Sequence, residues 1–145
     1  MGAFDAVMSK TFDVIVVGAA LNGLAAGLAL GGHRARRPLS VAIIDRRDPR
    51  QALSRDSDGR ASAITASSKR MFEALGVWEG VAPHMQEMGE IIVTDGRGPE
   101  ARPVLLQFGE SRSGEPASAF MTENHHLLQG LVDSVEKSPN ITLVT

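Results

Sequence analysis

The sequence has no cysteine and no large excess of charge of either sign. Without cysteine, the chain cannot form a disulfide bond, a thiolate metal site or a cysteine nucleophile. Fifteen lysines and arginines against 17 aspartates and glutamates give a formal net charge of −2. Such a balance gives no general attraction to nucleic acid or to acidic membranes, and a nucleic-acid partner is not expected.

Long apolar segments are also missing. The longest, residues 24–30 with their flanks, is interrupted by glycine and is too short for the ~20 residues of a membrane span. The N-terminal sequence MGAFDAVMSK lacks the basic segment followed by an apolar segment that marks a signal peptide. Together with the absence of cysteine, these features suit a cytoplasmic protein.

What the chain does contain is typical of a globular domain. It has 145 residues, of which 43% are apolar and 22% charged, and 15 are glycine. A chain of this length buries about 68–70% of the surface that it exposes when unfolded, which is enough for a real core. We therefore expect one domain, or part of a larger one, with many turns.

The first 45 residues alternate between strand and helix patterns. Residues 13–17 are apolar and β-branched without alternation, which predicts a strand buried on both faces of a parallel sheet. Residues 19–30 are rich in alanine and leucine and predict a helix packed deep against that sheet. A second buried strand is expected at residues 40–44, ending at Asp45. This order predicts an α/β fold that begins with a Rossmann-like βαβ unit.

The remainder of the chain mixes helices with short strands. Residues 46–60 are polar and predict a long loop, and residues 64–75 predict a helix that stops at Gly76. Asn124 is a candidate cap for a further helix. Four more strands are expected, of which the first three would form an antiparallel insert and the last would rejoin the parallel sheet: residues 90–94, 104–108, 118–122 and 141–144.

The turn GAALNGLAAG, which begins at Gly18, is the first candidate site. In a dinucleotide-binding turn the first glycine allows the tight bend, the second lets the backbone approach a pyrophosphate, and the third lets helix and strand pack closely. Gly18 and Gly23 supply the first and third, whereas Ala20 stands at the second and brings a methyl group. The whole turn, including Ala19 and Asn22, is a predicted pyrophosphate-binding segment. The alternative is a tight connection that serves only helix packing.

Asp45 is the second candidate. It follows Gly18 by 27 residues, close to the separation at which an acid binds the ribose hydroxyls of the adenosine half. A carboxylate there would repel a 2′-phosphate and therefore favours FAD or NAD over NADP. Arg46 and Arg47 follow directly and weaken that preference, and Arg46 is itself a candidate contact. The alternative is a solvated strand end.

Further segments give the chain a family resemblance. They are the run from Asp58 to Ile64, the sequence LGVW at residues 75–78 and the pair Glu123–Asn124. With the βαβ opening, they resemble the ubiquinone-biosynthesis hydroxylases, a branch of the FAD-dependent aromatic monooxygenases. That family shows a glycine fingerprint, an acid-ended second strand, a D-x-R-x-x-A-L-like segment, an L-G-x-W helix end and an E-N-R segment that opens a helix.

The resemblance implies a role for each matching residue. Gly18 and Gly23 would hold the FAD pyrophosphate, Asp45 the adenosine ribose, and Arg60 phosphate or flavin oxygens. The alternative for Arg60 is a loop arginine paired with Asp56 or Asp58. The sequence departs from the family at Ala20 and at His125, which replaces the arginine of E-N-R. His125 could donate a hydrogen bond to phosphate when protonated, and its alternative is a surface histidine beside His126.

The resemblance also implies an activity. The parent enzyme would reduce FAD with NADH or NADPH and use O₂ to hydroxylate an aromatic polyprenyl substrate in ubiquinone biosynthesis. A lipid-like substrate implies peripheral association with the inner membrane or with a biosynthetic complex. No residue here stands out as an acid–base catalyst, and the pair His125–His126 does not predict a metal site. The sequence predicts no particular oligomeric state.

The resemblance divides the chain into four parts. Residues 1–10 would be a tail, 11–88 the FAD-binding βαβ portion, 89–122 inserted strands of the substrate domain, and 123–145 a return to the FAD-binding domain. Members of the family are longer, so this chain is expected to be an N-terminal portion that is inactive alone. Two alternatives stay open: a NAD-dependent dehydrogenase domain, and a non-catalytic pseudoenzyme or scaffold in a biosynthetic complex.

Overall fold

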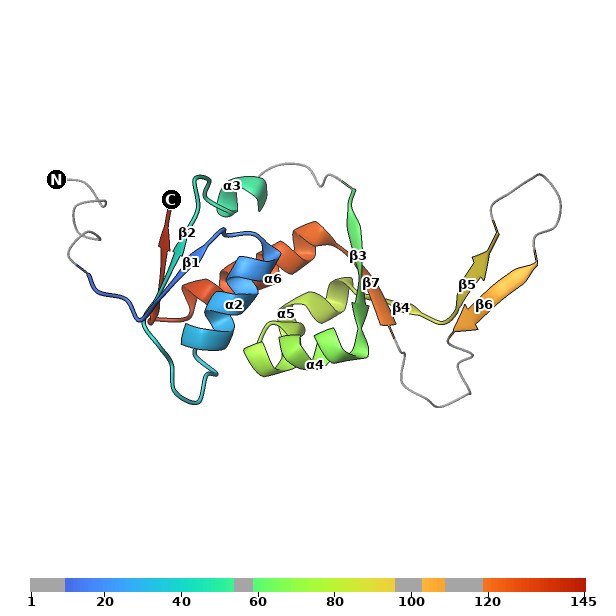
Figure 1. Cartoon of the computed structure of the whole chain (residues 1–145), viewed down its shortest axis with the longest axis horizontal. Helices are drawn as coiled ribbons and strands as arrows, with labels where there is room; N and C mark the ends of the chain where they lie inside the picture. Colours follow the sequence, from blue (N-terminus) through green and yellow to red (C-terminus); the bar gives the residue numbers. More distant parts are fainter. Residues whose placement is uncertain (1–9, 54–58, 96–102, 109–118) are drawn as a thin grey trace.

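The computed structural model describes residues 10–53, 59–95, 103–108 and 119–145. Within them the chain forms three sheets joined by helices (Figure 1). The elements follow one another in this order: β1 (Val14–Val17), α2 (Leu21–Gly31), β2 (Val41–Ile44), α3 (Arg50–Leu53), β3 (Ala61–Thr65), α4 (Ala66–Leu75), α5 (Trp78–Val81), η1 (Ala82–His84), β4 (Gln86–Met88), β5 (Ile91–Thr94), β6 (Val104–Phe108), β7 (Ala119–Glu123), α6 (Asn124–Glu136) and β8 (Ile141–Val144).

The expected βαβ unit is present, and with it the predicted α/β fold class is confirmed. Strands β1, β2 and β8 form a parallel sheet in the order β1-β2-β8. Helices α2 and α6 contact each other and lie beside this sheet (Figure 1). Their leucines form the centre of the core together with Ile43 of β2. The largest fully buried leucines are Leu24, Leu28, Leu127 and Leu131.

One expectation for the first strand is wrong. β1 lies at the end of the described parallel sheet and is not buried on both faces, because Ile15 is 60% exposed and Val17 is 85% exposed. Val14 and Val16, which alternate with them, pack against the core. The described helices α2 and α6 supply one layer, and the side chains that point to the other face of β1 have no layer over them among the described residues. Helix α2 is likewise buried along one side only, with Leu30 37% exposed.

The second sheet begins earlier than the sequence predicts. Residues Ala61–Thr65 form strand β3, which pairs with β7 in an antiparallel sheet of order β3-β7-β4. The expected helix at residues 64–75 therefore starts two residues later, at Ala66, where the Thr65 hydroxyl accepts from the Ser68 N–H at 3.3 Å. It ends as expected at Gly76, which has a φ of +76°. Antiparallel pairing thus starts inside the range 11–88 that the resemblance assigns to the FAD-binding portion.

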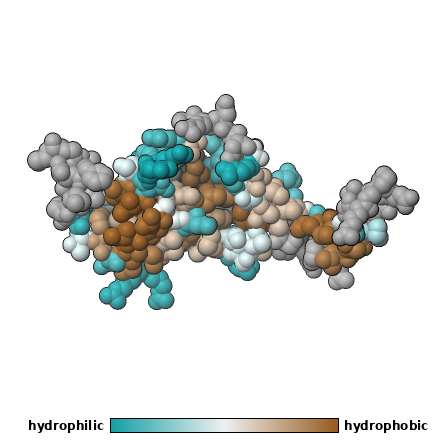
Figure 2. All heavy atoms as spheres, turned by 45° about the horizontal axis from the view of Figure 1, so that its top comes forward, coloured by the Kyte–Doolittle hydropathy of each residue, from teal (hydrophilic) through white to brown (hydrophobic). Residues whose placement is uncertain are grey.

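The third sheet is a hairpin of β5 and β6 that extends away from the helices (Figure 1). Both strands are close to the expected ranges. Six of their side chains are apolar and exposed, and they form the brown area at the right of Figure 2. These residues are Ile91, Ile92, Val93, Val104, Leu105 and Leu106, each between 37% and 59% exposed.

Candidate FAD-binding site

The turn between β1 and α2 owes its shape to two glycines. Gly18 has a φ of +107°, a backbone conformation that residues with a Cβ rarely adopt, and its N–H donates to the carbonyl of Ile44 at 2.7 Å. Gly23 lies in the first turn of α2 against the same bend. A Cβ at Gly23 would lie 1.8 Å from the Gly18 carbonyl oxygen. The two glycines therefore bring the start of α2 close to the end of β1.

Ala20 does not need to be glycine for conformational reasons. It precedes α2 with a φ of −85° and a ψ of −176°, which any residue adopts without strain. It is exposed and lines a cavity. The alanine at this position therefore affects only the space that is left for a ligand.

The start of α2 is suited to an anion. The Leu24 N–H donates to the carbonyl of Ala20, so the N–H groups that precede it lie before the first intrahelical bond. No acidic side chain occupies the first turn of the helix. The positive end of the helix dipole adds to these donors. A pyrophosphate placed here would meet free N–H groups and a favourable field.

Asp45 holds the turn in place. Its Oδ2 accepts from the Ala19 N–H at 2.7 Å, and its Oδ1 accepts from the Arg47 N–H at 3.0 Å. The hydrogen bond from Ala19, followed by that from Arg47, lowers the pKa of Asp45 below its usual value, so the side chain is a carboxylate at neutral pH. Each oxygen keeps a second lone pair that can accept from a hydroxyl. Asp45 can therefore tie the turn to β2 and bind a ligand as well.

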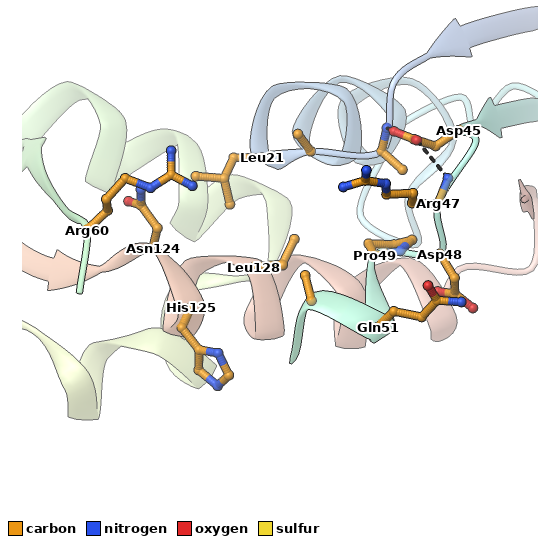
Figure 3. Close-up of a pocket in the computed structure, with 13 residues that line it drawn as sticks. Leu21, Asp45, Arg47, Asp48, Pro49, Gln51, Arg60, Asn124, His125 and Leu128 are labelled. Carbon is orange, nitrogen blue, oxygen red and sulfur yellow. Dashed lines mark hydrogen bonds between the residues drawn. The ribbon is translucent and has the colours of Figure 1, made fainter. Parts of the chain in front are cut away.

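A cavity of about 580 Å³ connects this turn with the start of α6 (Figure 3). Figure 3 shows Asp45 and Arg47 at one end, Arg60 and Asn124 at the other, and Leu21 between them. Five of the residues singled out from the sequence line it: Ala19, Ala20, Asp45, Arg60 and His125. Four others do not: Gly18, Asn22, Gly23 and Arg46. The two glycines act through the shape of the turn, while Arg46 is exposed beside Asp45.

The far end of the cavity forms where β3 meets α6. Asn124 is the first residue of α6, and its backbone N–H donates to the Arg60 carbonyl at 2.9 Å. The expectation that Asn124 caps this helix is wrong, because Glu123 holds the cap position and the Asn124 side chain accepts from the Ser62 hydroxyl at 2.5 Å. The alternative pairing of Arg60 with Asp56 or Asp58 concerns residues outside the described ranges.

His125 belongs to a group of three imidazoles. Its ring meets the edge of His126 with centroids 5.6 Å apart, and His126 stacks on His84 of η1 at 3.8 Å. Burial, followed by the charges of His84 and His125, lowers the pKa of His126. In Figure 3 the His125 ring points away from Arg60. Within the described part of the chain, no three histidines, aspartates or glutamates are arranged to hold a metal ion.

Sequence reasoning missed several residues that line the cavity. Most of them come from the loop after Asp45, which contains the short helix α3, and the others from α2 and α6. Arg50 of this loop forms an ion pair with Asp48 at 2.8 Å and reaches Glu136 of α6 at 3.3 Å, which fixes the loop against that helix. The position of the loop directly after Asp45 is the signal that could have identified them. The missed residues are Leu21, Arg47, Asp48, Pro49, Gln51, Ala52, Asn124 and Leu128.

Comparison with known proteins supports a flavin site. The FAD binding domain family matches residues 11–142. Among curated proteins, ubiquinone hydroxylase UbiL of Rhodospirillum rubrum is 31% identical over 93% of this chain, and the Escherichia coli 3-demethoxyubiquinol 3-hydroxylase is 27% identical over 90%. The chain spans only 29% and 32% of these two relatives. No helix in the described ranges has the length and apolar character needed to cross a membrane.

Solved structures agree on the fold. PqsL, a probable FAD-dependent monooxygenase from Pseudomonas aeruginosa, superposes with a TM-score of 0.66 at 18% identity, over 93% of this chain and 33% of its own. The flavin-dependent monooxygenase PieE, solved with FAD and substrate, gives 0.63 at 20% identity over 94% of this chain and 24% of its own. The resemblance inferred from the sequence motifs is thus confirmed. The chain belongs to the FAD binding domain family, and its curated relatives include ubiquinone-biosynthesis hydroxylases.

Proposed function

We propose that this chain binds FAD in the cavity between the β1–α2 turn and the start of α6. The adenosine ribose lies at Asp45, the pyrophosphate at the N-terminus of α2, and the flavin half toward Arg60 and Asn124. The observation that carries the proposal is the distribution of donors and acceptors along this one cavity. The Asp45 carboxylate, at the end of the cavity near the β1–α2 turn, can accept hydrogen bonds from hydroxyl groups, and the N–H groups at the start of α2 can bind phosphate.

The charges of the cavity fit the two halves of the cofactor differently. The Asp45 carboxylate is stabilised as an anion by two backbone N–H groups, so it accepts hydroxyl hydrogens and disfavours a further phosphate beside it. At the other end, Arg60 brings a planar set of N–H donors that suits phosphate or flavin oxygens. His125 is available as an additional donor on the first turn of α6. The Ala20 methyl group narrows the space at the pyrophosphate and lowers affinity without abolishing binding.

For the whole protein we infer an FAD-dependent monooxygenase that hydroxylates an aromatic polyprenyl precursor in ubiquinone biosynthesis. Support comes from relatives whose names describe ubiquinone hydroxylation. Bound FAD supplies the redox chemistry with O₂ after reduction by NADH or NADPH. This chain contributes the residues that bind the adenosine ribose and the pyrophosphate, and at the far end of the cavity Arg60 and Asn124 face the flavin half. Because it spans about a third of its relatives or less, we propose that it does not hydroxylate by itself.

Peripheral association with the inner membrane or with a biosynthetic complex, from the cytoplasmic side, is part of the same proposal. A polyprenyl tail partitions into lipid by about 0.8 kcal/mol for each buried CH₂ group, so the substrate resides in the bilayer. An enzyme that acts on such a substrate must reach the membrane surface. A flotation assay with the full-length protein and lipid vesicles tests this association, and a protein that never floats with vesicles would contradict it.

The FAD proposal is tested by titrating the purified chain with FAD and following the quenching of flavin fluorescence. Asp45→Ala should weaken binding, because it removes the ribose acceptor and releases the Ala19 N–H. Asp13→Ala is the matched control. The Asp13 carboxylate also accepts a backbone N–H, that of Ser40 at 2.8 Å, but it lies at the opposite end of β1 and β2. Equal affinities of the two variants would remove Asp45 from the site.

The two alternatives predict other results. A NAD-dependent dehydrogenase domain would bind NADH in preference to FAD, and the family match favours FAD over this alternative. A non-catalytic scaffold would bind neither cofactor in its full-length form. If the full-length protein takes up no FAD, the flavoenzyme proposal fails.

A further inference from the structure

Asn124 is held at two points by strand β3. Its backbone N–H donates to the carbonyl of Arg60, the residue that precedes the strand, at 2.9 Å. Its side-chain Oδ1 accepts from the hydroxyl of Ser62, the second residue of the strand, at 2.5 Å. The side-chain contact joins residues that lie 62 positions apart in the chain. The first residue of α6 is therefore fixed in both position and side-chain orientation.

The contact with Ser62 decides which part of the amide remains for a ligand. The side-chain carbonyl of Asn124 faces Ser62, so the NH₂ group is the part left over, and it has two hydrogens to donate. Asn124 lines the cavity beside Arg60 (Figure 3). Asn124 and Ser62 are both only half-buried. Without the hydroxyl, the Asn124 amide could rotate and present its oxygen, an acceptor, to the same space.

We propose that Ser62 is a positioning residue for FAD, which acts through Asn124 and never touches the cofactor. It holds the amide so that its NH₂ group donates to acceptor oxygens of the flavin half. The inference rests on the proposed FAD site. It adds that Ser62 makes Asn124 a hydrogen-bond donor, not an acceptor, at the far end of the cavity. Strand β3 belongs to the antiparallel sheet, and α6 packs against α2, which contacts the strands of the parallel sheet. Ser62 therefore lies where the two sheets meet at the proposed cofactor site.

FAD and ADP together test this role. ADP has the adenosine and pyrophosphate but lacks the flavin half, so it would not reach Asn124. Ser62→Ala should weaken FAD binding about twofold to tenfold, the effect of one net hydrogen bond, and leave ADP binding unchanged. Ser62→Thr keeps a hydroxyl and should restore FAD affinity. Ser67→Ala is the matched control, because the Ser67 hydroxyl bonds Thr65 at 2.8 Å and does not line the cavity.

A double-mutant cycle tests whether Ser62 acts through Asn124. Asn124→Ala should weaken FAD binding, and adding Ser62→Ala to it should have no further effect. Independent effects of the two substitutions, equal losses for FAD and ADP, or an unchanged FAD affinity in Ser62→Ala would each overturn the inference while leaving the FAD site itself intact. If the unsubstituted chain binds no FAD, the proposed function fails and this inference fails with it.

Discussion

The substitution Gly23→Ala tests the site, because Gly23 packs directly against the backbone of Gly18 in the turn. The new Cβ would lie 1.8 Å from the Gly18 carbonyl oxygen and 2.9 Å from the Gly18 carbonyl carbon. Ordinary contact begins at 3.4 Å, so the oxygen and the Cβ must separate by about 1.6 Å. Both are tied to the backbone, and Gly18 is already held by its bond to Ile44. We expect a loss at or above the upper end of the about 1–3 kcal/mol usual for overpacking.

Substitutions at two other glycines, Gly27 and Gly80, provide comparisons for the expected loss of stability at Gly23. Gly27→Ala would place its Cβ 2.5 Å from the Ile43 Cδ1, the end of a side chain that can rotate away, and should cost less. A Cβ at Gly80 in α5 would have no atom within 4 Å, so Gly80→Ala should be neutral or stabilise by about 0.5–1 kcal/mol.

Urea unfolding followed by circular dichroism gives the three free energies of unfolding, and flavin quenching gives the FAD affinity of each variant. The expected order of stability is Gly80→Ala, then Gly27→Ala, then Gly23→Ala. Only the last should also lose most FAD binding, since it pushes α2 away from β1. A Gly23→Ala variant with the stability of Gly80→Ala and an unchanged FAD affinity would refute the reasoning.

Two predictions concern pH. The pKa of Asp45 is lowered in the folded state. Its contribution to the free energy of unfolding is therefore present above the unfolded pKa of 3.8 and is lost as the pH falls through the folded pKa. In urea unfolding experiments, the free energy of unfolding of Asp45→Asn should fall less steeply with decreasing pH in this acid range. The pKa of His126 is also lowered, so the folded state resists its protonation and stability should fall as the pH drops below 6.5. Burial is the largest cause of this shift, and the charges of His84 and His125 add to it while Glu123 opposes it. His84→Phe keeps a stacked ring but removes one of these charges, so it should make thermal unfolding less sensitive to pH as the pH falls below 6.5.

The near end of the cavity could be predicted from the sequence because its signals are local. Gly18 and Gly23 stand five residues apart and shape a single turn, and Asp45 is placed beside them by the parallel pairing of Val17 with Ile44. A βαβ unit dictates that arrangement wherever its strands and helix form. What the sequence could not reveal is that both Asp45 oxygens already accept backbone hydrogens, since that depends on the exact path of the turn.

The exposed side of β1 shows a limit of a different kind. An uninterrupted apolar run is typical of a strand with layers on both faces. Val17 is nevertheless 85% exposed, because α2 and α6 both lie on the side to which Val14 and Val16 point. The apolar run at Val14–Val17 indicates only that both faces of the strand could be buried. It carries no information about which described segment covers each face.

The far end of the cavity depends on contacts between segments that no local pattern connects. The spacing of Ile64, Phe72 and Leu75 predicts that the helix begins at residue 64, although Ile64 and Thr65 are the last residues of strand β3. The partner of that strand, β7, lies more than 50 residues later in the chain. Only this pairing brings Ser62 to Asn124. The same pairing explains why Asn124 does not cap α6, although asparagine before an apolar stripe is a common cap signal. Here the side chain bonds across to β3, and the amide that would have capped a helix becomes part of the cavity wall instead.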